Sequence, residues 1–222
     1  MESVARGGTR WKRFALVMVP GVAATAAIGI GLAQGALAAS FAVSGQEFKV
    51  KAGHLEGWGF AQYGGVDVGY KDMEGDGVTG RAVAISSFRD AEIRNMCQSV
   101  VTDMPILGKI TMRLTAGTGE DPVVAENLYL DIAQLDGDAV FEDIDIGVAA
   151  RDTDRARGGK GPAVTDGKGS AKSKVFENGF AQQARKATLT DVEQVAWATT
   201  AGSFKLSDMS LRLHRGTEKE CF

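Results

Sequence analysis

The sequence predicts an all-β protein: one domain of short, repeated antiparallel strands that form an open groove, a flattened barrel or a solenoid-like stack, preceded by an N-terminal hydrophobic helix. Three observations predict it. Beyond residue 40, apolar and polar residues alternate with a period of two, as in half-buried strands. No long segment there has the period of a helix. A four-residue unit recurs along the chain, and after each copy the apolar residues lie on the other face of the strand.

This recurring unit is clearest in residues 125–150, where it reads apolar, any residue, Asn or Asp, apolar. In a strand, apolar residues three apart point to opposite faces unless the chain bends between them. Asn and Asp tolerate such a bend. The polar position of the unit falls at five residues, with spacings near 16 or its multiples: Asn95, Asn127, Asp143, Asp191 and Asp208. We therefore predict that the strands bend at these five residues.

Residues 1–38 predict export. Basic residues at the start precede a stretch without charge from Phe14 to Gln46, and residues 36–38 (Ala-Leu-Ala) place small side chains where a signal peptidase reads them. We expect a signal peptide cleaved after Ala38. An uncleaved membrane anchor is the alternative, because about 20 apolar residues can span a bilayer. In both cases residues 39–222 would be extracellular or on the outer face of the cytoplasmic membrane, since the basic flank stays inside.

The charge of residues 39–222 argues against a nucleic-acid partner. This part has 21 Lys and Arg against 27 Asp and Glu, a net charge of −6. Residues 151–174 are the exception, with seven basic residues, three acidic ones and almost no large apolar side chain. This composition is typical of a flexible loop. We expect a solvated insertion there, with contact to anionic cell-envelope polymer or lipid as the alternative.

Cys97 and Cys221 are the only two cysteines, and both lie in the exported part. A lone pair in an oxidising compartment favours one disulfide, which would tie the end of the chain to its middle. Two separate thiols or a bridge between molecules are the alternatives.

Residues 53–72 combine six glycines with Trp58, Phe60, Tyr63 and Tyr70. Such aromatic side chains could form a stacking platform for sugars or sterols. The sequence favours another interpretation, in which the aromatic rings pack over glycines in a twisted sheet.

No metal or cofactor site is predicted. Residues 73–80 are predicted to form a turn, and the acidic residues Asp72, Glu74 and Asp76 could suggest a calcium loop, but the remaining EF-hand ligands are missing. Residues 131–145 are also acidic; we expect a solvated face there, with a divalent-ion site as the alternative. The chain contains neither a P-loop nor a dinucleotide-binding fingerprint.

No catalytic residues are predicted either. A Gly-x-Ser-x-Gly elbow is absent, and the chain has two histidines, His54 and His214. Ser210 and His214 would share one face of a strand, but roughly 13 Å apart at 3.3 Å per residue. That distance is too long for the hydrogen bond that activates a serine.

Several segments resemble a known family. These are RGGTRWKRFA near the N-terminus, NMCQSV at 95–100, ENLYLDIAQLDGDAVFEDIDIGVAA at 126–150, GFAQQA at 179–184 and AWATTAG at 196–202. The chain resembles a family of exported actinomycete proteins of unknown function, some of which carry the label cholesterol esterase. The label implies a nucleophile, and no motif of this sequence provides one.

Together these features predict an exported, non-catalytic cell-envelope protein. Two forms fit the sequence. In one, the apolar face is filled by its own side chains and the protein is structural. In the other, an apolar groove that includes Leu130 and Ile146 binds lipid or another hydrophobic ligand. A secreted lipid-ester hydrolase, acting on carboxylic or sterol esters, is the alternative that the resemblance implies.

Overall fold

The computed structural model describes residues 44, 46–71, 77–153 and 174–222. The predicted leader and hydrophobic helix, residues 73–76 of the predicted turn and most of the predicted basic loop lie outside these residues. Residues 78–80 were predicted as part of that turn, but they begin a strand. None of the helices in the described part has the length and hydrophobicity that crossing a bilayer requires.

The prediction of an all-β domain is confirmed. Within the described residues every strand pairing is antiparallel, and the helical structure is a single turn of 3-10 helix. The elements are β1 (Phe48–Tyr70), β2 (Val78–Arg94), β3 (Met96–Met104), β4 (Gly108–Ala116), β5 (Val123–Ala149), η1 (Ala150–Asp152), β6 (Lys174–Val175), β7 (Phe180–Thr200), β8 (Ser203–Lys205) and β9 (Ser210–Arg215).

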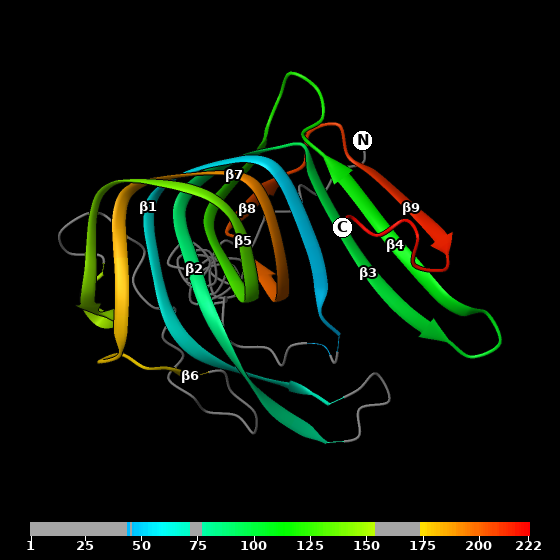
Figure 1. Cartoon of the computed structure of the whole chain (residues 1–222), viewed down its shortest axis with the longest axis horizontal. Helices are drawn as coiled ribbons and strands as arrows, with labels where there is room; N and C mark the ends of the chain where they lie inside the picture. The colour runs from blue at the N-terminus through cyan, green and yellow to red at the C-terminus, as the bar shows by residue number, and fades with distance from the viewer. Residues whose placement is uncertain (1–43, 45, 72–76, 154–173) are drawn as a thin grey trace, which may run out of the picture.

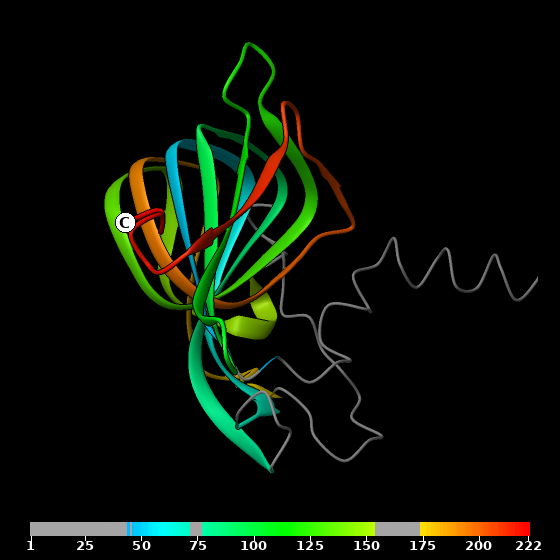
Figure 2. The same ribbon diagram turned by 90° about the vertical axis from the view of Figure 1, so that its right-hand side faces the viewer.

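Four of these strands close into a small barrel. Strand β1 pairs with β2 along one edge and with β7 along the other. Strand β5 completes the ring, because its first part pairs with β2 and its later part pairs with β7. Figure 1 shows the four strands as an arch, and Figure 2 shows them curving round a common interior. Strands β3, β4 and β9 extend the sheet beyond the barrel.

All five predicted bends are confirmed. Asn95, Asn127, Asp143, Asp191 and Asp208 have φ values of 50–55°, in the left-handed region that Asn and Asp tolerate better than other side chains do. The four barrel strands are longer than the short strands predicted: β1, β2, β5 and β7 contain 23, 17, 27 and 21 residues. In β5 and β7 this is because the strand continues through the bends at Asn127, Asp143 and Asp191.

The bends line up from strand to strand. Asn95 lies between β2 and β3, beside Gly53 of β1. A Cβ added to Gly53 would be 3.3 Å from the side-chain nitrogen of Asn95. Gly53 in turn faces Asp191 of β7, and a Cβ on Gly137 of β5 would be 3.3 Å from the Asp191 carbonyl oxygen. Two of the five bends, at Asn95 and Asp191, therefore lie in one row across the sheet with Gly53 and Gly137, where glycine leaves room for the bent backbone.

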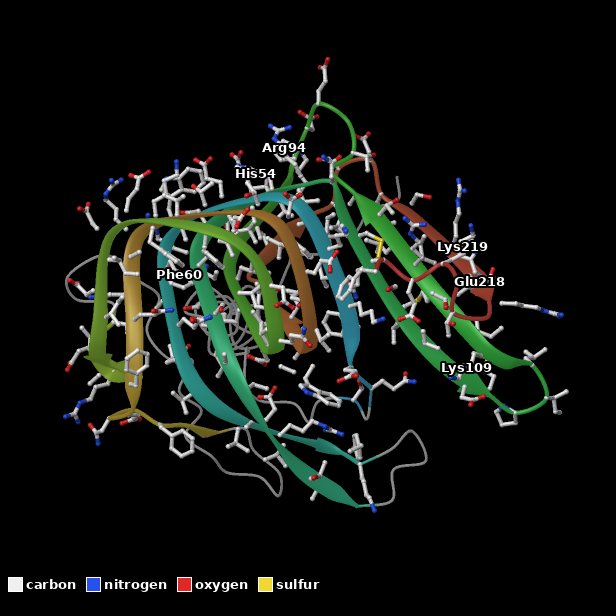
Figure 3. The ribbon with its side chains drawn as sticks, viewed as in Figure 1. His54, Phe60, Arg94, Lys109, Glu218 and Lys219 are labelled. Atoms are coloured by element: carbon white, nitrogen blue, oxygen red, sulfur yellow. A yellow bond between two sulfur atoms is a disulfide. The ribbon has the colours of Figure 1, made fainter. Side chains whose placement is uncertain are left out.

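The barrel interior holds the main apolar core. The Phe60 ring lies 5.3 Å from Phe88 and 5.2 Å from Phe141, centroid to centroid, so one aromatic stack joins β1, β2 and β5. Figure 3 shows Phe60 within the arch. Tyr63, like Phe60, is buried, whereas Tyr70 is exposed. The packing of an aromatic ring over glycine occurs at Gly57, which lies under the Phe88 ring.

The predicted disulfide is confirmed. Cys97 and Cys221 are bonded, with their Cα atoms 5.8 Å apart. The bond holds the C-terminal segment against β3, and the backbone N–H of Cys221 also donates to Ser99 Oγ (3.1 Å). Residues 216–222 are thereby fixed to one face of the β3–β4–β9 extension.

Candidate functional site

A cavity of about 130 Å³ lies inside the barrel. All four barrel strands supply apolar side chains to its wall, including Leu55, Phe60, Phe88, Leu130, Phe141 and Leu189. A smaller space of about 30 Å³ continues from it and shares Leu55, Leu130, Val192 and Gln194. The interior therefore contains an apolar space that its own side chains leave unfilled.

A chain of three polar side chains reaches the wall of this cavity. Gln62 donates from Nε2 to Ser86 Oγ (2.8 Å), and Gln182 donates from Nε2 to Gln62 Oε1 (2.7 Å). Gln62 and Ser86 line the cavity. The chain of hydrogen bonds holds these side chains in place, so the apolar wall of the cavity includes a polar patch.

The cavity opens beside β5. Strands β2 and β5 pair as far as Ala84 and Ile132, and beyond these residues the described part of β2 no longer pairs with β5. Residues 133–140 of β5 are exposed on both faces of the strand. Leu135, Gly137 and Ala139 nevertheless line the cavity. A side of β5 that faces the interior is therefore reachable from solvent.

Of the two residues predicted for an apolar groove, the structure places one in this wall. Leu130 lines the cavity and is buried. Ile146 is 65% exposed, pairs with Gln182 and does not line the cavity. Gln62 and Ser86 were not predicted, because their approach depends on the pairing of β1 with β2, which local alternation does not specify.

A pair of acidic side chains lies beside the barrel. Asp67 is buried, with 1% of its surface exposed, and is hydrogen-bonded to half-buried Asp131. Burial, and then the nearby Asp67 carboxylate, raise the pKa of Asp131 to about 8. One proton is therefore held between two carboxyl groups at neutral pH.

This pair predicts a pH-dependent stability. An unfolded aspartate has a pKa of about 3.9, so between about pH 4 and 8 the folded state holds a proton that the unfolded state has lost. The free energy of unfolding therefore falls as the pH rises through this window, by up to about 1.4 kcal/mol per unit. Thermal unfolding followed by circular dichroism should give a higher midpoint at pH 6 than at pH 8.

The Asp131→Asn variant should lose most of this dependence and should unfold at a higher temperature than the wild type at pH 8. An amide can still donate to Asp67 but does not ionise. Asp138→Asn, at an exposed position of the same strand, is the matched control. Equal slopes in the wild type and in Asp131→Asn would contradict the assignment.

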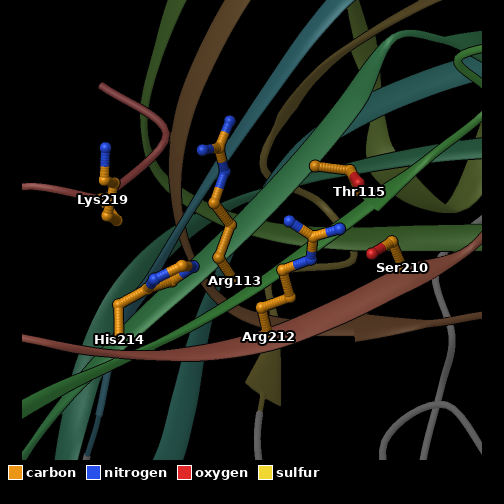
Figure 4. A pocket seen from close by; sticks show the side chains of 6 residues that line it. All are labelled: Arg113, Thr115, Ser210, Arg212, His214 and Lys219. Carbon is orange, nitrogen blue, oxygen red and sulfur yellow. The ribbon is translucent and has the colours of Figure 1, made fainter.

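A second, polar cleft of about 430 Å³ lies on the β4–β9 part of the sheet. It is lined by Arg113, Thr115, Ser210, Arg212, His214 and Lys219 (Figure 4). Ser210 and His214 thus share a cleft, but Arg212 lies between them on the same face of β9. Among the described residues no hydrogen bond joins the two, and no carboxylate lines the cleft with them. The cleft lacks the oriented base that a serine nucleophile needs.

The described residues contain no cluster of His, Cys, Asp or Glu that could hold a metal ion. In comparisons with known proteins, the model of a family of unknown function, DUF6230, matches residues 44–222. No curated protein and no solved structure matches the chain.

Proposed function

Since the chain belongs to the DUF6230 family, for which no activity is known, we propose its function from the barrel: it is an exported, non-catalytic module that holds the apolar end of a lipid or similar hydrophobic ligand. The observation that carries the proposal is the apolar cavity of about 130 Å³ that opens beside β5. Export rests on the leader features of residues 1–38.

The size of the cavity sets the class of ligand. It is close to the roughly 150 Å³ of an engineered apolar cavity that stays dry and binds benzene, and smaller than the roughly 300 Å³ at which drug-sized pockets begin. A whole lipid does not fit. The end of an alkyl chain does, and each methylene that it buries contributes about 0.8 kcal/mol.

The exposed inner side of β5 favours a ligand over a purely structural barrel. In a structural barrel, side chains from the facing strands would cover Leu135, yet it is 37% exposed while it lines the cavity. Water at such an apolar wall is unfavourable, and an alkyl chain entering beside β5 would displace it. Gln62 and Ser86 would offer hydrogen bonds to a polar group of the ligand.

The test is native mass spectrometry of the full chain secreted by its own host, followed by solvent extraction. We expect the mass of residues 39–222 plus a reproducible apolar adduct. After delipidation, the protein should bind decanoate in calorimetry. Ala139 lies at the opening, lines the cavity and is exposed, so Ala139→Trp should block entry with little effect on folding. We expect at least tenfold weaker binding.

Val140→Trp is the matched control. Val140 is the next residue of β5, is 66% exposed and does not line the cavity. The same tryptophan on the other side of the strand should leave decanoate binding unchanged. A ligand-free mass together with no decanoate binding, or equal losses in both variants, would reject the proposal in favour of a structural protein.

A further inference from the structure

The β3–β4–β9 extension has two chemically different faces. Strands β4 and β9 pair so that Met112 lies opposite Leu213 and Leu114 opposite Leu211 on one face. On the other face Arg113 lies opposite Arg212, with Thr111 opposite His214 and Thr115 opposite Ser210 at either side. The C-terminal segment crosses this polar face, because the Thr111 hydroxyl donates to the Gly216 carbonyl (2.6 Å).

Positive charge gathers on the polar face without neutralisation. Arg113, Arg212 and Lys219 line the cleft together with His214. No ion pair involves these four side chains within the described part of the chain. Several other cations are paired, as Lys51 is with Glu193 (2.6 Å). Lys109, Lys205 and Arg215 also lack an ion pair among the described residues, but they do not line a common cleft. The gathering of cations at this cleft stands out because residues 39–222 are acidic overall.

This arrangement costs stability in the empty protein. Like charges directly opposite each other on neighbouring antiparallel strands repel, and Arg113 and Arg212 occupy such positions. Lys219 adds a third formal charge from a different segment. Side chains that only needed solvation could lie far apart, whereas these line one cleft (Figure 4).

Two of the cations are held in place. Arg113 donates from Nε to Cys97 Sγ (3.2 Å), which leaves the terminal nitrogens of its guanidinium group for the cleft. The segment that carries Lys219 is fixed by the Cys97–Cys221 bond and by the ion pair of Lys49 with Glu220 (2.7 Å). The charges are therefore preorganised, which lowers the entropy that a ligand must remove on binding.

We propose that this cleft binds a phosphate group, as free phosphate or as part of a phosphate ester. Arginine presents paired N–H donors that match phosphate oxygens, and two arginines with a lysine balance a multiply charged anion. Thr115 and Ser210 supply hydroxyl donors at the edge. The volume of about 430 Å³ accommodates the ester's attached group. This site is separate from the barrel cavity, and the two share no lining residue.

The test uses the full exported chain with its disulfide intact. Inorganic phosphate and pyrophosphate are titrated by calorimetry, and flotation measures binding to phosphatidylcholine vesicles with and without phosphatidylglycerol. Arg212→Gln should weaken binding at least tenfold. Without ligand, this variant should unfold at the same temperature as the wild type or higher, because it removes the Arg113–Arg212 repulsion. A residue with a merely structural role would not combine weaker phosphate binding with an unchanged or higher unfolding temperature.

Arg215→Gln is the matched control, since it removes the same charge from the same strand. Arg215 follows the lining residue His214 but does not itself line the cleft. If the protein binds phosphate or pyrophosphate, and Arg212→Gln but not Arg215→Gln weakens that binding, the result supports a soluble phosphate ligand. If it binds only the vesicles that contain phosphatidylglycerol, and Arg212→Gln alone weakens that binding, the result supports a phosphate headgroup. Binding to none of these probes, or equal weakening by both variants, would overturn the proposal.

Discussion

Replacing both cysteines, Cys97→Ser with Cys221→Ser, should lower the free energy of unfolding by about 2–4 kcal/mol. The bond links residues 124 apart and so restricts the unfolded chain over more than half its length. It also holds residues 216–222, which are otherwise held by the Lys49–Glu220 ion pair and a few exposed or half-buried hydrogen bonds. Urea denaturation followed by intrinsic tryptophan fluorescence measures the change.

The wild-type protein in dithiothreitol is the control for the substituted side chains, and its transition should move to that of the double variant. A second readout follows from the position of Lys219, which this bond fixes at the polar cleft. Phosphate binding should weaken in the double variant under conditions in which the barrel remains folded. A midpoint within error of the wild type would show that the C-terminal segment contributes little to stability.

Gly57→Ala should destabilise the barrel by about 3 kcal/mol, because the interior has no room for the added methyl group. Its Cβ would lie 2.3 Å from Cδ1 of Phe88, a contact that real structures do not contain. The ring cannot move away easily, since Phe88 is 2% exposed and is packed against Phe60. Chemical denaturation at neutral pH measures the loss.

Gly64→Ala is the matched control, because Gly64 belongs to the same strand and an added Cβ there meets nothing within 4 Å. Its effect should be small or stabilising, since alanine restricts the unfolded chain more than glycine does. Phe88→Leu should cost less in the Gly57→Ala background than in the wild type, because it removes the clash. Independent, additive losses would show that the two residues are not in contact.

The positions of the bends were predictable because their cause is local. At Asp143 and Asp191, for example, an apolar residue precedes by two and follows by one, so the strand must turn its face there. Asn and Asp accept the left-handed backbone that this requires. The alternation of polar and apolar residues in 109–116 is equally local, and it assigns Arg113 and Thr115 to the face opposite Met112 and Leu114. The disulfide followed from having only one possible pair.

Which strands meet was decided by the tertiary structure. The closure of β5 onto both β2 and β7 joins residues far apart in sequence, and it creates the cavity around Leu130 while leaving Ile146 exposed. The pairing of β4 with β9 places Arg113 opposite Arg212, and the pair Asp67 and Asp131 also forms between distant strands. Alternation assigns a residue to a face of its own strand, but the neighbour on that face depends on long-range register, which no local pattern encodes.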